Sequence, residues 1–252
     1  MSEQKLPMAA PAEAAPTPPQ RPATSPARMV ATLAIAGAVA GAAIVTVFSW
    51  ANPRIQANQA ARLEAAILEV LGGATRYETV FLDGGSLTAE PQADTATLDR
   101  VYMGFDAAGA PRGIAIATQA SGFADVVRVI FGYDPASGNL LGMKVLENKE
   151  TPGLGDKIEK DSTFVGEFVD VGTPLLGVKK DRATGAHEEI VMITGATISS
   201  RTVVDMINQR LEVLREPVGA FWASAGAAEG ATGGTATATP EAGTAGQTGG
   251  GL

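Results

Sequence analysis

The feature that most constrains this chain is an uncharged apolar segment near its N-terminus. Residues 29–50 read MVATLAIAGAVAGAAIVTVFSW and contain no charged side chain. A helix needs about 20 apolar residues to cross the hydrocarbon core of a bilayer. A cleaved secretory signal would have a shorter apolar stretch and a shorter region before it. We therefore predict a single uncleaved transmembrane helix over 29–50, in contact with the lipid bilayer.

The two ends of the chain have compositions that oppose folding. Residues 1–28 are rich in Pro and Ala, and residues 223–252 are rich in Gly, Ala and Thr. Such segments cannot bury enough apolar surface to offset the entropy lost on ordering. The composition predicts a disordered arm over 1–28 and a low-complexity, disordered tail over 223–252.

The basic residues that flank the apolar segment predict its orientation. Lys5, Arg21 and Arg28 precede the segment together with the free amino terminus, whereas Arg54 and Arg62 follow it. An excess of positive charge marks the cytoplasmic side of a membrane segment. We therefore expect a cytoplasmic arm and a main domain on the outer side, which is the periplasmic side of a bacterial cell inner membrane.

The composition also excludes several classes of function. The chain has no cysteine, which rules out disulfides, thiolate nucleophiles and iron–sulfur ligands. With the single histidine His187, neither a catalytic triad nor a metal centre is expected. The formal net charge of -8 argues against a nucleic-acid partner, because phosphate contacts need clustered Lys and Arg.

Residues 54–218 carry the patterns of one folded domain. An amphipathic helix is expected over 55–71, and a second one closes the domain with Val203, Ile207, Leu211 and Leu214 on one face. A further helical stretch begins at about residue 156. Short apolar runs predict strands at 100–105, 113–118, 125–133, 140–147 and 188–193, with a hairpin turn at 134–139. Because helices and strands do not alternate regularly, the fold class predicted is α+β.

The stretch ITGATISSR, residues 193–201, stands where the closing helix starts. Gly195 allows unusual backbone angles, Ala196 is small, and Thr194 and Thr197 each offer a hydroxyl. The unpaired N–H groups of a helix start suit a phosphate. The alternative is a plain N-cap, in which Thr194, Thr197 or Ser199 only satisfies those N–H groups. The residues themselves leave both interpretations open.

A second Gly-containing stretch, ETPGLGDK, occupies residues 150–157. Pro152 restricts the backbone, while Gly153 and Gly155 expose N–H groups without side chains in the way. The result is a rigid loop with bare amides, suited to a planar or anionic ligand. Its alternative is an ordinary connection between a strand and a helix.

Together with the N-terminal anchor, NKETPGLGDKI at 148–158 and ITGATISSRTVV at 193–204 resemble the G subunit of the bacterial Rnf electron-transport complex. The chain is similar, less closely, to the C subunit of the sodium-pumping NADH:quinone reductase. The resemblance covers roughly residues 29–215. One departure is Val191, which stands where the family commonly has Asp, three residues before the first hydroxyl residue of the motif.

The resemblance implies a covalent FMN cofactor. In that family a phosphoester joins the ribityl phosphate of FMN to the last threonine of the motif, which is Thr197 here. Thr194, Gly195, Ala196, Ser199 and Arg201 would then surround the attachment point. A separate flavin transferase would make the bond. The family loop beside the flavin corresponds here to Glu150, Thr151, Pro152, Gly153, Leu154 and Gly155.

The resemblance also implies a function. The chain would relay electrons inside a multisubunit membrane complex that couples electron transfer between ferredoxin and NAD to ion translocation, and it would not be catalytically complete alone. Three alternatives stay open: the C subunit of a sodium-pumping reductase, a membrane-anchored flavin sensor, and a structural adaptor in which the threonines only cap a helix.

Overall fold

The structure is a computed structural model that describes residues 25–232, with side chains as far as residue 225. Most of the arm and tail expected from composition, at 1–24 and 233–252, lies outside the described residues. Contacts divide the chain into two compact units, residues 1–56 and 57–252. Each unit is described here by itself.

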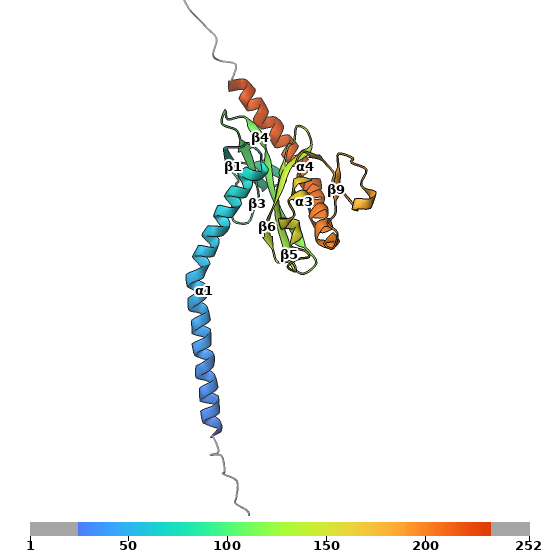
Figure 1. Cartoon of the computed structure of the whole chain (residues 1–252). Coiled ribbons are helices and arrows are strands. Elements are labelled where there is room, and N and C mark those ends of the chain that lie inside the picture. The colour runs from blue at the N-terminus through green and yellow to red at the C-terminus, as the bar shows by residue number, and fades with distance from the viewer. Residues whose placement is uncertain (1–24, 233–252) are drawn as a thin grey trace, which may run out of the picture. The chain divides into compact units, whose positions relative to one another are not determined.

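The first long element is a single helix, α1, which runs from Pro26 to Val70 (Figure 1). The expectation of two separate helices, over 29–50 and 55–71, was wrong, because α1 continues through Pro53. A proline removes one backbone donor, and a helix can absorb this loss with a local adjustment instead of ending. The expectation of a disordered arm was also wrong for residues 26–28. Proline is favoured at the first position of a helix, where its missing N–H is not needed.

The part of α1 in the first unit has the surface of a membrane segment. Its best window has a mean hydropathy of 2.2 and is not buried by any other part of the described chain. Large apolar side chains such as Leu33 (78%) and Phe48 (63%) are exposed. The helix is therefore long and apolar enough to cross a membrane, as the sequence predicted.

The second unit is built on an antiparallel sheet of seven strands in the order β2-β1-β3-β4-β5-β6-β7. The strands β3 to β6 confirm four of the strands predicted from the sequence, although each begins or ends at slightly different residues. The bounds are β1 (Arg76–Asp83), β2 (Ser86–Thr88), β3 (Asp99–Phe105), β4 (Pro111–Ser121), β5 (Val126–Tyr133), β6 (Asn139–Asn148) and β7 (Val171–Gly172).

The first hairpin was missed by the sequence analysis. β1 and β2 are joined at Gly84 and Gly85, which both have positive φ angles. Glycine tolerates such angles, and a Gly pair between two strands is a recognised hairpin signal. The strand pattern of residues 76–83 is weak, because only Val80 in it is fully buried.

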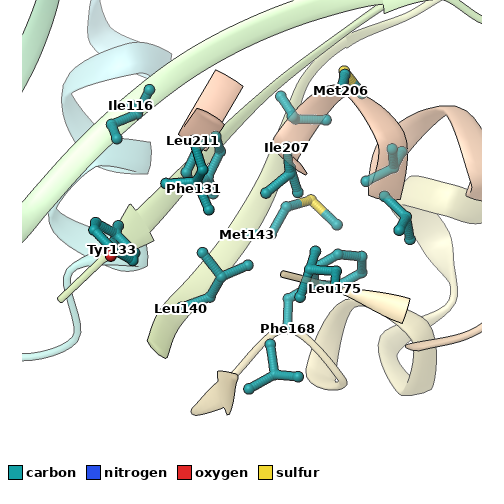
Figure 2. Close-up of a cluster of buried hydrophobic side chains, with 14 of the residues drawn as sticks. Ile116, Phe131, Tyr133, Leu140, Met143, Phe168, Leu175, Met206, Ile207 and Leu211 are labelled. Atoms are coloured by element: carbon teal, nitrogen blue, oxygen red, sulfur yellow. The ribbon is translucent and has the colours of Figure 1, made fainter. Parts of the chain in front are cut away.

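The two faces of the sheet pack against different helices. Alternate residues point to opposite faces of a strand. On one face, Tyr102, Ala115 and Ile130 contact the last turns of α1. The other face packs on α4 (Thr197–Thr232), and this cluster is the main core (Figure 2). Its fully buried members include Ile116, Phe131, Leu140, Phe168, Ile207 and Leu211.

Between β6 and α4 the chain forms short elements that lead to the glycine-rich motif. The helical stretch expected from about residue 156 is two short helices, α2 (Lys157–Lys160) and α3 (Ser162–Gly166). They are separated at Asp161, whose carboxylate accepts hydrogen bonds from two N–H groups of α3. A small parallel sheet follows, β8 (Leu176–Val178) with β9 (Glu189–Val191), and a 3-10 helix, η1 (Lys180–Arg182), lies between its strands.

The expected tail was wrong over residues 223–232, where α4 continues to Thr232. This stretch is rich in alanine, the residue with the highest intrinsic helix propensity. The tail was predicted to be disordered because its glycines and threonines disfavour a helix.

Two paired glycines test how tightly α1 packs on the sheet. A Cβ on Gly132 would lie 2.2 Å from the carbonyl oxygen of Val70, whereas a Cβ on its cross-strand partner Gly142 would lie 3.6 Å from the same atom. We predict that Gly132→Ala lowers the free energy of unfolding by about 1–3 kcal/mol, because the helix backbone must move. Gly142→Ala should cost well under about 1 kcal/mol. Urea unfolding of the detergent-solubilised chain measures both, and equal costs would contradict the close packing.

Candidate functional site

The motif at 193–201 begins with a turn that connects β9 to α4. Met192 N donates to the carbonyl of Val178 at 2.8 Å, which continues the β8–β9 pairing by one residue. Ala196 N then donates to the carbonyl of Ile193 at 3.0 Å, and Gly195 has a φ of +84°. A turn of this kind needs a residue that accepts positive φ at its third position, which explains the glycine.

Thr197 is the first residue of α4, and its side chain is partly exposed. Its Oγ1 makes one long contact, donating to the carbonyl of Ile193 at 3.4 Å. Among the described residues, no backbone N–H of the first helical turn donates to the hydroxyl of Thr194, Thr197 or Ser199. The N-cap alternative is therefore not the arrangement found. No donor of the described chain reaches the hydroxyl oxygen of Thr197.

A pocket of about 480 Å³ lies beside this hydroxyl. It is lined by Thr194, Thr197 and Met192, and by Lys179, Lys180 and Asp181 from the segment that follows β8. The ammonium groups of two lysines would stabilise a phosphate held at Thr197. The sequence motifs did not place these lysines at the site. Their closeness depends on the parallel β8–β9 pairing, which no local pattern indicates.

Glu150, the first residue of the ETPGLG loop, is 5% exposed and points inward. Its Oε2 accepts a hydrogen bond from Ser199 Oγ at 2.8 Å, and its Oε1 accepts from the backbone of Ala124 at 3.0 Å. A Cβ on Gly122 or on Gly155 would lie within 2.4 Å of one of these carboxylate oxygens. The carboxylate thus joins three segments: residues 121–125, residues 150–156 and the start of α4.

The rest of the loop is held by internal hydrogen bonds and presents its surface outward. Gly153, with a φ of +80°, donates its N–H to Asp156 Oδ1 at 2.7 Å. Lys160 Nζ donates to the other oxygen at 2.7 Å, and this contact is the main reason why the pKa of Asp156 is lowered. Thr151, Pro152, Gly153 and Leu154 are exposed, whereas Gly155 is buried against Glu150.

Each of the three joined segments exposes one large apolar side chain. These are Phe123 (67%), Leu154 (50%) and Ile198 (56%). Phe123 was not singled out from the sequence, because the loop 121–125 has no motif of its own. Exposed apolar groups gathered around one buried anchor are typical of a surface that contacts a ligand.

Two other residues considered from the sequence lie at the edges of the site. Arg201 is exposed on α4 and makes no ion pair or hydrogen bond with the described part of the chain. Val191 ends β9, and its N–H donates to Glu167 Oε2. Burial raises the pKa of Glu167.

The Glu150–Ser199 contact can be tested with a matched pair of serines. Ser199→Ala leaves Glu150 Oε2 without this donor in a buried position, and we predict a loss of about 1–3 kcal/mol in unfolding free energy. Ser200 is equally buried, but its hydroxyl donates at 2.9 Å to the carbonyl of Ala196, which Ser200 N also reaches. Ser200→Ala should therefore cost only about 0.5 kcal/mol.

The local readout for the same pair is amide hydrogen exchange. Exchange at residues 122–126 and 151–155 should accelerate in Ser199→Ala and stay unchanged in Ser200→Ala. If both variants behave alike, Glu150 does not hold the three segments together.

The chain is similar to known proteins in sequence and in fold. Residues 122–212 match the FMN-binding domain family, a range that contains Glu150 and its donors Ala124 and Ser199. The crystal structure of Shewanella oneidensis NqrC aligns with a TM-score of 0.52 at 16% identity, over 65% of this chain and 99% of that chain. At this identity the match shows a shared fold.

Two relatives are named as the G subunit of an ion-translocating oxidoreductase complex. That of Methanosarcina acetivorans is 26% identical over 185 residues, which are 73% of this chain and 92% of the relative. That of Escherichia coli K12 is 30% identical over 161 residues, 61% of this chain and 74% of the relative. The chain therefore belongs to the family of G subunits of ion-translocating oxidoreductase complexes.

Proposed function

We propose that this protein is a membrane-anchored electron-transfer subunit that carries FMN covalently on Thr197, within a complex that couples electron transfer to ion translocation. The observation that carries the proposal is the Thr197 hydroxyl, which takes no part in capping α4 and lines a pocket with Lys179 and Lys180. Membership of the G-subunit family and the FMN-binding domain match support it.

The residues present fit the parts of FMN. The phosphate needs a hydroxyl and positive charge, which Thr197 and the two lysines provide. The ring system needs apolar contact, which the exposed Leu154 provides on a loop that Glu150 joins to the segments of Phe123 and Ile198. The N–H groups of Gly153 and Leu154 are already used inside this loop, so the bare amides expected from the sequence are not found at these two residues. When bound, FMN supplies one- or two-electron redox chemistry.

The chain itself positions the cofactor and does not perform the redox chemistry. An ester bond at Thr197 would prevent loss of the flavin by dilution on the outer side of a membrane. The loop anchored by Glu150 would hold the ring in one orientation and exclude water from one of its sides. In the family a separate transferase makes the ester bond, so Thr197 needs no general base of its own.

The attachment is tested by the mass of the intact, fully denatured chain, isolated from its own membrane. We expect an added mass of FMN less one water, mapped to the peptide that contains Thr197. Thr197→Ala should lose this mass completely, because no other oxygen takes the place of Oγ1.

Thr194→Ala is the matched control, since Thr194 lines the same pocket, and it should keep the modification. A flavin that resists denaturation in Thr197→Ala would overturn the assignment of the residue. An unmodified, colourless wild-type chain would favour the structural adaptor, and noncovalent FMN without redox partners would favour the sensor.

The proposed orientation places the FMN-binding domain on the periplasmic side. Because the natural chain has no cysteine, single cysteines report accessibility without background. We predict that Ser137→Cys, in the exposed turn between β5 and β6, reacts with a membrane-impermeant maleimide in cells with a permeable outer membrane. Ser2→Cys should react only after the inner membrane is broken, and the reverse pattern would show the opposite orientation.

A further inference from the structure

A second surface of the FMN-binding unit has the features of a binding site. The last turns of α1 cover Tyr102, Ala115 and Ile130 on one sheet face, whereas Arg100 and Arg128 on the same face stay exposed. Where α1 leaves this face, at Gln59 and Arg62, a groove of about 900 Å³ opens between α1 and strands β3 to β6. This volume lies within the range of about 300–1,000 Å³ that is usual for ligand sites.

Three arginines line the groove from three different elements. Arg62 comes from α1, Arg100 from β3 and Arg128 from β5. The strand register explains their meeting: Tyr102 pairs with Ala115, and Ala117 pairs with Ile130. Because side chains alternate, Arg100 and Arg128 project on the same face as these residues, on either side of Ala117.

None of the three arginines forms an ion pair within the described residues, although Glu147 lies opposite Arg128 in the β5–β6 pairing. Arg128 is held in place through Gln119 Oε1, which accepts from its Nε at 3.2 Å and its Nη2 at 3.0 Å. This contact orients the guanidinium without neutralising it. We name the site lined by Arg62, Arg100 and Arg128 the arginine groove.

Two of the three acidic side chains of the groove form ion pairs. Asp99 pairs with Arg210 on α4, outside the groove, whereas Glu147 pairs at 2.9 Å with Lys149, which also lines the groove. Glu159 is the one remaining carboxylate among the groove residues of the described chain. With four basic and three acidic residues in its lining, the groove keeps a small excess of positive charge on a chain whose net charge is -8. Guanidinium groups bind carboxylates in paired hydrogen bonds, so this charge favours a carboxylate-bearing occupant.

The arginine groove borders the candidate flavin site. Asn148 lines the groove, and its Oδ1 accepts a hydrogen bond from the backbone of Glu150 at 2.9 Å. β4 also ends at Ser121, directly before the loop that contacts Glu150. We infer that the arginine groove docks a carboxylate-rich segment of another protein of the complex, beside the flavin-binding loops.

This inference rests on the proposed function, because it needs a complex in which the chain exchanges electrons. An acidic segment fits better than a small anion, since the positive charges are spread over α1, β3 and β5. Docking beside the loops would bring a redox partner close to the cofactor. Electrostatic complementarity of this kind sets orientation and association rate.

The test compares two triple variants of the full-length chain in its own membrane. R62Q/R100Q/R128Q removes the groove charges, and R76Q/R112Q/R182Q removes three exposed arginines outside the groove. The tagged chain is captured, and the other subunits retained are quantified by mass spectrometry at rising salt, from about 50 to about 300 mM NaCl. Both variants change the net charge equally.

We expect the groove variant to retain about tenfold less of the other subunits, since each exposed arginine–carboxylate contact contributes roughly twofold. The control variant should match the wild type. Equal retention by both variants would overturn the inference. The attached flavin mass and the thermal midpoint are measured on the same samples, so a failed flavin assignment or a misfolded variant is recognised separately.

A second measurement identifies the occupant. A photoreactive benzophenone amino acid replaces Ala117, which lies between Arg100 and Arg128 on the groove floor. We expect a cross-linked peptide from another protein of the complex that contains clustered Asp or Glu. Cross-links found only within this chain would overturn the inference. So would stabilisation of the wild type, but not of the groove variant, by millimolar citrate with unchanged retention of the other subunits.

Discussion

The carboxylate of Glu150 is the contact on which the candidate site depends. A charge away from water is costly unless donors surround it, and these donors come from distant parts of the chain. Ser199, which donates to Oε2, is 49 residues away in sequence, and Ala124, which donates to Oε1, is 26 residues away. If any one of these segments moved away, the Glu150 carboxylate or one of its donors would be left buried without a hydrogen-bond partner. The loop 150–156, the loop 121–125 and the start of α4 therefore hold one arrangement together.

In the candidate site, the residues that hold the backbone in place differ from the residues that remain accessible to a ligand. Glu150, Gly155 and Ser199 are buried and fix the backbone, whereas Thr197, Leu154 and Phe123 remain accessible on the same segments. This division would suit the proposed covalent cofactor, because a modifying enzyme would have to reach the attachment point while the surrounding loops stay ordered. The partly exposed hydroxyl of Thr197 and the lysines beside it meet this requirement without a catalytic base.

The two faces of the sheet differ in how completely they are covered by helices. The face toward α4 carries the main core, which is closed by Phe168 and Leu175 from the segment after β6 (Figure 2). The face toward α1 is only partly covered, and its open part forms the arginine groove. Both the groove and the flavin loops lie where β4 ends, β5 begins and β6 ends. The cofactor site and the proposed docking surface thus share one edge of a rigid scaffold.

Much of the fold was predictable because its signals are local. The uncharged run at 29–50, the alternating strands and the apolar face of the closing helix each depend on neighbouring residues, so a short window reveals them. The errors came where local signals were weak or balanced. Pro53 favoured a break that α1 does not make, β1 has little burial, and the alanines after residue 222 prolong α4.

By itself, the sequence determined the membrane-compatible helix, the α+β class and the glycine turn that leads into α4, since each follows from composition and short-range geometry. The family resemblance pointed to Thr197. Only the tertiary structure decided which residues surround it. The β8–β9 pairing brings Lys179 to the pocket of Thr197, the buried carboxylate joins Glu150 to Ser199 in α4, and strand register brings the groove arginines together. Such contacts join residues far apart in the chain, so no sequence window contains them.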